Sequence, residues 1–263
     1  MDSMPERRVI AVVNQKGGVG KTTTAVNLAT CLALTGKRTL LIDLDPQANT
    51  TSFLGVDKKT LTQSIYDVLI DGIPLASVRR QVAVDKLDLI PSTIGLVGAE
   101  VELVGMENRE TRLRTALAAP EIGGYQFVMI DCPPSLNILT INALAASQSV
   151  LIPMQCEYFA LEGLGLLLET IKRVQSALNP SLTIEGVLLT MYDGRLNLSR
   201  QVEEEARRFF TGKVYRTVIP RSVRLSEAPG FGKPIALYDT HSTGAVNYAS
   251  LAQEVLAQEG MTP

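Results

Sequence analysis

The chain has 263 residues, 46% of them hydrophobic, so it is long enough to bury a sizeable core. Its formal net charge of −2 argues against recognition of nucleic acid or membranes through bulk charge, although a local basic patch is compatible with it. Three widely spaced cysteines and a single histidine argue against a disulfide framework, a zinc site and a histidine-based triad.

Neither end of the chain indicates a membrane segment. The apolar run Val9–Val13 after the basic N-terminus is only strand-length, too short for a signal-peptide core. No run of about 18 apolar residues predicts a membrane span. The stretch Glu254–Pro263 holds no Lys or Arg, unlike a basic membrane-targeting helix. We therefore expect a cytoplasmic protein with no membrane partner.

Short β-branched runs alternate with helical patterns along the chain. Strands are predicted, in order, over Val9–Val13, Arg38–Asp43, Leu87–Pro91, Gln126–Asp131, Ser149–Pro153, Thr183–Thr190 and Val214–Ile219. Helices are predicted over Lys21–Leu34, Ser64–Ile70, Leu96–Gly105, Arg109–Ala119, Leu139–Ala146, Leu161–Leu178, Ser199–Phe210 and Ala245–Leu256. This alternation predicts an α/β fold with a mostly parallel, twisted sheet and helices on both faces. We expect residues 1–263 to form a single domain, with 1–7 as a flexible tail.

Two of these helices carry signals at their ends. Gly36 follows the first helix and is expected to cap its C-terminus. Ser199 is expected to be the N-cap of the helix that ends at Phe210. Four residues are predicted to share the apolar face of that helix: Val202, Ala206, Phe209 and Phe210.

A glycine-rich stretch follows the first predicted strand and opens the first predicted helix. Its glycines let backbone N–H groups turn inward, and the helix N-terminus adds a partial positive charge, so together they bind phosphate. Lys21 supplies a charge for the β- and γ-phosphates of ATP, the Thr22 hydroxyl is placed to ligate Mg²⁺, and Thr23 can bond the α-phosphate. A turn without a ligand is the alternative. The predicted ATP-binding residues are Lys16, Gly17, Gly18, Val19, Gly20, Lys21, Thr22 and Thr23.

Carboxylates follow two of the predicted strands. Asp43 and Asp45 stand at a strand's carboxyl end, where an Asp can orient or deprotonate an attacking water. The alternative is that both only cap a loop. Asp131 ends an apolar strand and is predicted to hold Mg²⁺, through water. Cys132 is interpreted as a small buried residue and not as a nucleophile.

These motifs resemble those of the ParA/MinD family of P-loop ATPases, whose phosphate loop carries an additional lysine at its start. Lys16 occupies that position here. Further matches at Gln155–Gly163, Thr190–Asp193 and Ile219–Pro234 extend the resemblance over nearly the whole chain. The chain resembles the small chromosomal ParA/Soj type, because it lacks both a long N-terminal extension and the basic C-terminal helix of MinD.

The resemblance implies an ATPase that dimerises when it binds ATP. Lys16 would reach across the dimer to the partner's nucleotide, and Asp45 would position the hydrolytic water, so the implied catalytic residues are Lys16, Lys21 and Asp45. Asp43 would lie in the outer shell of the metal. Pro220 and Arg221 match the loop that contacts adenine, although a proline after a strand is also an ordinary loop starter.

The resemblance further implies non-specific binding of double-stranded DNA on the nucleoid and a ParB-like partner that stimulates hydrolysis. Arg195 and Arg224 match arginines that carry DNA binding in the family, and neither has a carboxylate partner at the i,i+4 spacing of a helix-surface ion pair. In contrast, Glu203–Arg207 and Glu204–Arg208 have the spacing of helix-surface ion pairs. The other basic candidates are Arg200, Lys213, Arg216, Arg221 and Lys233.

Two other functions stay open at this point. One is a relative that positions a protein cargo and shares the same ATPase core. The other is a metabolic P-loop enzyme of the nitrogenase-reductase or synthetase kind. A nitrogenase-reductase-like site needs a second cysteine besides Cys132 to bridge a cluster, and the sequence offers none that is suitably placed.

Overall fold

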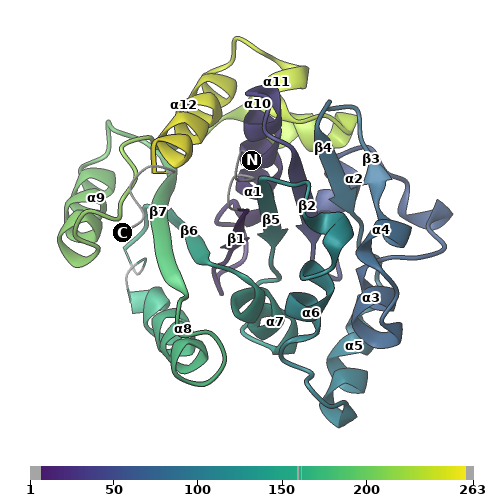
Figure 1. Cartoon of the computed structure of the whole chain (residues 1–263). Helices are drawn as coiled ribbons and strands as arrows, with labels where there is room; N and C mark the ends of the chain where they lie inside the picture. The colour runs from purple at the N-terminus through teal and green to yellow at the C-terminus, as the bar shows by residue number, and fades with distance from the viewer. Residues whose placement is uncertain (1–6, 159, 161, 259–263) are drawn as a thin grey trace, which may run out of the picture.

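The computed structural model describes residues 7–158, 160 and 162–258, and one eight-stranded sheet organises them (Figure 1). The strand order is β3-β4-β2-β5-β1-β6-β7-β8. Each neighbouring pair is parallel except β3 and β4, which are antiparallel at one edge. The strands are β1 (Arg8–Val12), β2 (Thr39–Asp43), β3 (Arg80–Gln81), β4 (Leu87–Ile90), β5 (Phe127–Asp131), β6 (Ser149–Gln155), β7 (Thr183–Tyr192) and β8 (Ile219–Pro220). The predicted α/β fold with a mostly parallel sheet is confirmed.

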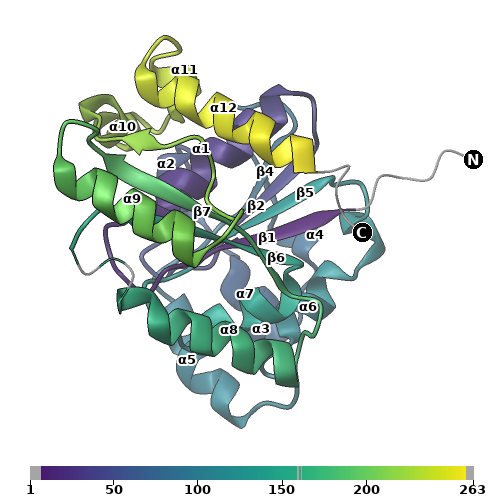
Figure 2. The same cartoon turned by 90° about the vertical axis from the view of Figure 1, so that its left-hand side faces the viewer.

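Helices cover both faces of this sheet (Figure 2). One layer contains α1 (Lys21–Leu34), α2 (Asn49–Phe53), α10 (Val223–Glu227), α11 (Ile235–Tyr238) and α12 (Thr243–Ala257). The other contains α3 (Ile65–Asp71), α4 (Leu75–Val78), α5 (Leu96–Glu102), α6 (Arg112–Leu117), α7 (Ile138–Ala146) and α8 (Gly165–Ala177), with α9 (Asn197–Phe209) beside β7. A separate apolar core fills the space on each face, which explains why the central strands are continuous apolar runs.

Most predicted boundaries agree with the structure, and α1 has the predicted limits. Gly36 takes a left-handed conformation (φ 95°) just after α1, as expected of a glycine at a helix end. The helix predicted from Arg109 begins at Arg112, because Thr111 is its N-cap and has a non-helical backbone (φ −125°, ψ 10°). The helix predicted from Leu161 begins at Gly165, and Leu161 itself lies outside the described residues.

Three expectations for the C-terminal third are wrong. Leu196 is the N-cap of α9, so Ser199 lies inside the helix and is buried. Phe209 does not belong to the apolar face, because its side chain is 63% exposed while that of Phe210 is buried. The strand predicted over Val214–Ile219 is reduced to a bridge at Val214 and the short β8.

A carboxylate on α12 accounts for that interrupted strand. The backbone N–H groups of Arg216 and Thr217 donate to the carboxylate of Glu254, at 2.9 and 2.7 Å, and not to a neighbouring strand. Of the tail predicted over 1–7, only Arg7 is described, and its carbonyl accepts a hydrogen bond from the Gln148 side chain. No described helix combines the length and apolar character of a membrane span.

Candidate functional site

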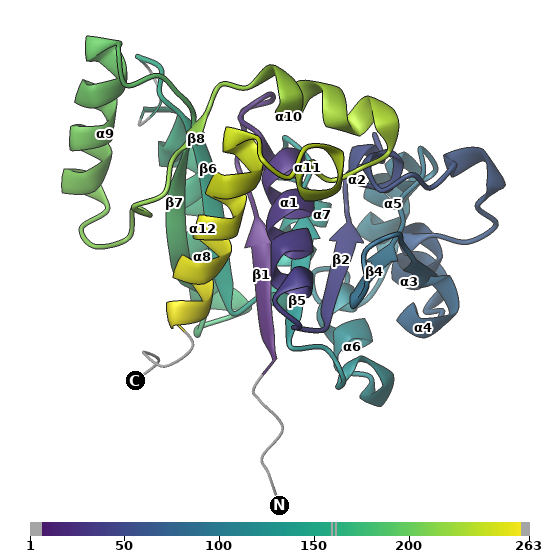
Figure 3. The same cartoon turned by 90° about the horizontal axis from the view of Figure 1, so that it is seen from above.

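The candidate site lies where the central parallel strands end. β1 and β2 point toward the side of the molecule on which α10 lies (Figure 3). The register pairs Asp131, at the end of β5, with Val12 on one side and with Asp43 on the other. The sheet therefore brings the two strand-end carboxylates next to the loop that connects β1 to α1, at the edge where open α/β sheets bind ligands.

The loop before α1 has the conformation of a phosphate-binding turn. Gly18 and Gly20 adopt positive φ angles of 76° and 87°, which residues with a Cβ rarely take. No side chain caps the N-terminus of α1, which begins at Lys21 directly after Gly20. The first N–H groups of the helix thus remain available to an anion, as a phosphate site requires.

Two neighbouring strands hold this loop in place. The Asn14 side chain donates to the carbonyl of Pro153 on β6, at 2.7 Å, and accepts from the N–H of Lys16 at 3.0 Å. The Thr190 hydroxyl on β7 donates to the carbonyl of Val19 at 2.8 Å. These contacts fix the loop before any ligand arrives, so little conformational entropy remains to be lost on binding.

The ammonium group of Lys21 lies next to the backbone of the phosphate loop. Its side chain is buried, and its Nζ donates to the carbonyl of Lys16 at 3.1 Å. Burial lowers the pKa of this ammonium group, while the nearby carboxylates of Asp131 and Asp45 act to raise it. A buried cation with a single backbone partner is short of anionic contacts, and a phosphate would supply them.

The Asp131 carboxyl group fits a magnesium site. Its Oδ2 accepts from the hydroxyls of Thr22 and Thr50, at 2.8 and 2.7 Å. Its Oδ1 is buried and has no hydrogen-bond partner among the described residues, and burial raises the pKa of the group to about 6. A buried oxygen without a partner beside a threonine hydroxyl matches the oxygen ligands that Mg²⁺ prefers. Burial raises the pKa of the Cys132 thiol well above its usual value, so this residue is no thiolate nucleophile.

Asp43 holds the loop that follows β2. Its carboxylate accepts hydrogen bonds from the N–H and the hydroxyl of Thr51 and from the N–H of Asp45. Burial is the main cause that raises the pKa of Asp43 to about 8, and the charge of Asp131 adds to it. The described contacts thus use Asp43 to position the loop, whereas its suggested place in the outer shell of a metal stays a prediction.

Asp45 stands at the start of a tight turn that leads into α2. Its Oδ1 accepts from the N–H of Gln47 at 2.8 Å, and its carbonyl accepts from the N–H of Ala48. Ala48 is left-handed (φ 53°) and is the N-cap of α2. The capping and the catalytic interpretations of Asp45 are compatible, because this turn places its carboxylate near Lys21 and Asp131.

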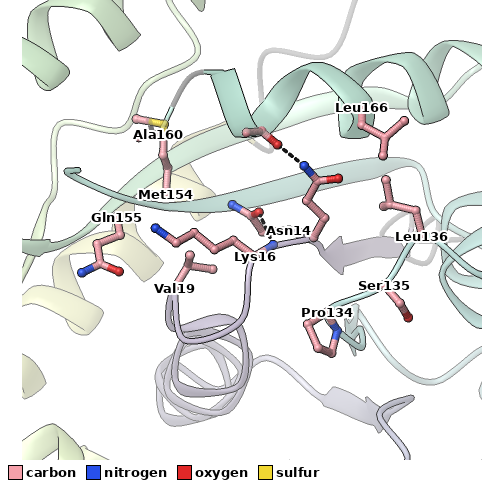
Figure 4. Close-up of a pocket in the computed structure, with 12 residues that line it drawn as sticks. Asn14, Lys16, Val19, Pro134, Ser135, Leu136, Met154, Gln155, Ala160 and Leu166 are labelled. Carbon is pink, nitrogen blue, oxygen red and sulfur yellow. Dashed lines mark hydrogen bonds between the residues drawn. The ribbon is translucent and has the colours of Figure 1, made fainter. Parts of the chain in front are cut away.

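Lys16 lies on the outer side of the same loop. Its side chain borders a cavity of about 800 Å³ and extends toward Gln155 at the end of β6 (Figure 4). The Nζ of Lys16 forms an ion pair with Glu157, and both side chains are about half exposed. Within one subunit, the ammonium group of Lys16 therefore pairs with Glu157, whereas that of Lys21 binds the backbone carbonyl of Lys16.

A second pocket, of about 210 Å³, lies beside the start of α1. It contains the two residues predicted to contact adenine, Pro220 and Arg221, together with Thr23 from the phosphate loop. Met191 bends the chain at its rim with a positive φ of 49°. Further residues that line this pocket are Thr190, Leu225, Ser226, Pro229 and Tyr248. Its position allows a base to bind next to phosphates held at the loop.

Arg195 and Arg224 have no carboxylate at the i,i+4 spacing, but both contact carboxylates at other positions. Asp193 accepts two hydrogen bonds from the Arg195 guanidinium, at 2.9 and 2.7 Å, which lowers the pKa of that carboxyl to about 2. Arg224 pairs with Glu227 at 3.1 Å and with Asp239 at 3.4 Å. The partners were missed because one lies within a loop and another comes from the end of α11. Both arginines are nevertheless largely exposed.

The ion pair expected between Glu203 and Arg207 on α9 is confirmed, at 2.9 Å. Arg207 also donates to the carbonyls of Val214 and Tyr215. The Arg207 side chain is only 38% exposed, whereas that of Arg195 is 90% exposed.

Sequence reasoning missed several residues that build the site. Thr50 and Thr51 follow the Asp45 turn and bind the two buried carboxylates, and the run of hydroxyl residues there was a usable signal. Asn14 and Thr190 act through backbone carbonyls, which a sequence pattern does not reveal. Glu157 stands within a matched motif, but only the fold brings it to Lys16.

Comparisons with known proteins agree with this geometry. A family model described as an AAA domain matches residues 7–184. The sporulation initiation inhibitor protein Soj of Bacillus subtilis is 58% identical to the chain, over 95% of the chain and 98% of that protein. The chromosome partitioning protein ParA of Myxococcus xanthus is 52% identical, over 96% of the chain and 89% of that protein.

Solved structures share the architecture. A cobyrinic acid a,c-diamide synthase from Mycobacterium smegmatis, with a bound ATP analogue and magnesium, superposes with a TM-score of 0.86. It is 38% identical, and the match covers 96% of this chain and 95% of that one.

Proposed function

The chain belongs to the ParA/Soj family of chromosome-partitioning ATPases. We propose that it is a switch that dimerises when it binds ATP, and that the dimer binds DNA. In this proposal two ATP-bound subunits meet face to face, and the dimer binds double-stranded DNA of the nucleoid without sequence preference. A ParB-like partner stimulates hydrolysis, which dissolves the dimer and releases the DNA. The cycle takes place in the cytoplasm and partitions a chromosome or a plasmid.

The protein is an ATPase that uses Mg²⁺. Bound Mg²⁺ supplies positive charge to the β- and γ-phosphates. The Thr22 hydroxyl and the Oδ1 of Asp131 would hold the metal, the latter through water. The Lys21 ammonium group would leave the carbonyl of Lys16 and bind phosphate oxygens. The Asp45 carboxylate, which lies near Lys21, would orient the water that attacks the γ-phosphate.

The position of Lys16 is the observation that supports dimerisation in this proposal. Its ammonium group extends along the cavity rim toward β6, away from the interior of its own phosphate loop (Figure 4). A Cβ at Gly17 or Gly18 would meet no atom of the described residues within 4 Å, apart from the chain neighbours of each glycine, so the outer side of the loop is open. A lysine that stands beside an open phosphate loop but faces outward suits the nucleotide of a second subunit.

The proposed DNA surface rests on exposed arginines. Arg195 and Arg224 lie in the loop after β7 and on α10, with side chains that are 90% and 56% exposed. Phosphate contacts by arginine give binding that is independent of sequence and sensitive to salt. A dimer presents each arginine twice, so weak contacts add up through avidity.

Co-sedimentation with double-stranded DNA tests the proposal. Binding is expected with ATP and not with ADP, and it should fall steeply as salt rises. The double variant Arg195→Glu, Arg224→Glu should dimerise normally but bind DNA at least about 10-fold more weakly. Arg173→Glu is the matched control, because Arg173 is an exposed arginine on α8. Equal binding with ATP and ADP, or full binding by the double variant, would contradict the proposal.

The metabolic alternative draws on the synthase that shares 38% identity with this chain. Relatives named for chromosome partitioning have higher identities, 52% and 53%, over nearly the same span. These identities favour the partitioning function over a synthase function. A relative that positions a protein cargo would share the same cycle, and would differ only in the partner that stimulates hydrolysis.

A further inference from the structure

Helix α5 is apolar on two opposite sides. Leu96, Ala99 and Leu103 are fully buried and pack into the core beneath the sheet. Four other apolar residues are exposed, and we call them the α5 stripe: Ile94, Val97, Val101 and Val104, with exposed fractions of 69, 51, 75 and 64%. Val97 and Val101 lie on α5 (Leu96–Glu102), Ile94 lies in the turn before it, and Val104 lies in the short 3-10 helix after it. Their spacing of three, four and three residues is that of one side of a helical segment. A continuous exposed row of β-branched residues is unusual on a solvated face and marks an interaction surface.

Acidic residues are the only charged residues near this stripe in the sequence. No Lys or Arg occurs from Leu87 to Asn108, whereas Glu100, Glu102 and Glu107 do. The nearest following cations are already used, since Arg109 pairs with Glu110 and Arg112 donates to backbone carbonyls. The surface thus combines apolar contact area with negative charge. The proposed DNA surface at Arg195 and Arg224, which we call the arginine surface, has the opposite charge.

The segment that carries the stripe touches the nucleotide site at two points. The Glu100 carboxylate accepts a hydrogen bond from the Asn137 side chain at 2.5 Å. Asn137 caps α7 and ends the loop that follows Asp131. At the other end, the N–H of Ser92 donates to the hydroxyl of Thr51, the residue that binds Asp43. A change at α5 can therefore reach both loops of the phosphate site.

We propose that the α5 stripe is the docking surface for a basic amphipathic helix of another protein, the partner that stimulates ATP hydrolysis. The apolar side of that helix covers the four stripe residues, and its Lys or Arg residues face Glu102 and Glu107. DNA and anionic lipid are repelled by these carboxylates. A second copy would set acidic surface against acidic surface. The role of the partner rests on the proposed function, whereas the docking surface itself does not.

A peptide titration tests the docking surface. The probe is a fluorescein-labelled 18-residue helical peptide with Leu on one side and Lys on the other, and its control carries Glu in place of Lys. Fluorescence anisotropy should show at least about 10-fold tighter binding of the Leu/Lys peptide to the protein. The double variant Val101→Glu, Val104→Glu should lose at least about 10-fold of that affinity. Equal binding of both peptides, or full binding by the variant, would overturn the proposal.

A matched variant controls for non-specific apolar binding. Leu34 and Val246 are as exposed as the stripe residues, at 56 and 54%, but they line a groove between α1 and α12. Leu34→Glu with Val246→Glu should bind the Leu/Lys peptide as the unaltered protein does. An equal loss in both double variants would show that the peptide binds apolar surface in general, against the proposal.

Other occupants and the proposed function give separate outcomes. The Val101→Glu, Val104→Glu variant should keep its basal ATPase rate, its ATP-dependent dimer and its DNA binding. Loss of the dimer would identify the stripe as a contact between copies, and flotation of the unaltered protein with phosphatidylglycerol vesicles would identify a lipid surface. Either result overturns the docking proposal. If the unaltered protein does not bind DNA with ATP, the proposed function is overturned. The peptide titration would still decide whether the α5 stripe is a docking surface.

Hydrogen exchange tests the link to the nucleotide site. Binding of the Leu/Lys peptide should change the exchange of residues 132–140 in the unaltered protein. The same change should be absent in Glu100→Gln, which still binds the peptide but holds Asn137 less strongly. Unchanged exchange in the unaltered protein would overturn the claim that this docking surface controls hydrolysis.

Discussion

The phosphate site and the arginine surface both depend on positive charge, but they hold it in opposite ways. Lys21 is 7% exposed and has one backbone partner, while the side chain of Arg195 is 90% exposed and already bonded to Asp193. A buried cation short of anionic contacts gains much from an arriving phosphate. An exposed arginine exchanges a carboxylate and water for a DNA phosphate, and gains little per contact. A single subunit should therefore bind nucleotide well, whereas DNA binding should need several contacts at once.

Removal of the buried cation should have the largest effect. Lys21→Ala should weaken ATP binding roughly 100-fold or more, because the loop loses its point charge for the β- and γ-phosphates. Isothermal titration calorimetry with ATP and Mg²⁺ measures this affinity. Lys172→Ala is the control, because Lys172 is exposed on α8, and it should bind ATP normally. If Lys21→Ala binds ATP as tightly as the unaltered protein, the buried cation at the phosphate site does not determine nucleotide affinity.

Loss of the Asp45 carboxylate should separate binding from hydrolysis. Asp45→Ala should bind ATP but hydrolyse it at least about 100-fold more slowly, because the attacking water loses its orienting group. The variant should accumulate as an ATP dimer on DNA. Phosphate release over time provides the rate, with the exposed Asp85→Ala as the control. A normal rate in Asp45→Ala would show that another group positions the water.

The buried carboxyl groups should make the nucleotide-free protein sensitive to pH. Asp43 and Asp131 have pKa values raised from 3.8 to about 8 and about 6. Because each binds its proton more tightly in the folded state, the stability they contribute is complete below about pH 4 and is lost as pH rises toward 8. In Asp43→Asn the decline in Tm between pH 6 and 8 should be smaller by a few degrees. An identical decline in Tm would show that ionisation of Asp43 does not cause the loss of stability.

The smallest effect is expected on the arginine surface. Asp193→Asn removes the carboxylate that holds Arg195, so DNA binding with ATP should strengthen by about two- to threefold. Binding isotherms at two salt concentrations measure the change. Asp57→Asn, at an exposed turn away from α9, is the control. Weaker binding in Asp193→Asn would mean that Asp193 positions Arg195 for DNA and does not compete with it.

The sequence predicted the phosphate site better than the arginine surface, for a physical reason. Lys21, Thr22 and Asp131 act at the ends of central strands, where an apolar run and a glycine-rich turn are local signals. Ion pairs such as Arg224–Asp239 depend on where loops return in space, and spacing along the chain does not encode that. The same limit explains the lost strand at Val214–Ile219, because Glu254 on a distant helix takes its hydrogen-bond donors.

In the proposed cycle Lys16 binds the nucleotide of a second subunit, and sedimentation velocity with ATP tests this role. The hydrolysis-deficient Asp45→Ala protein should sediment as a dimer, and Glu157→Gln in the same background should do so too. Lys16→Ala in that background should still bind ATP but sediment as a monomer. A stable ATP dimer without Lys16 would contradict the account.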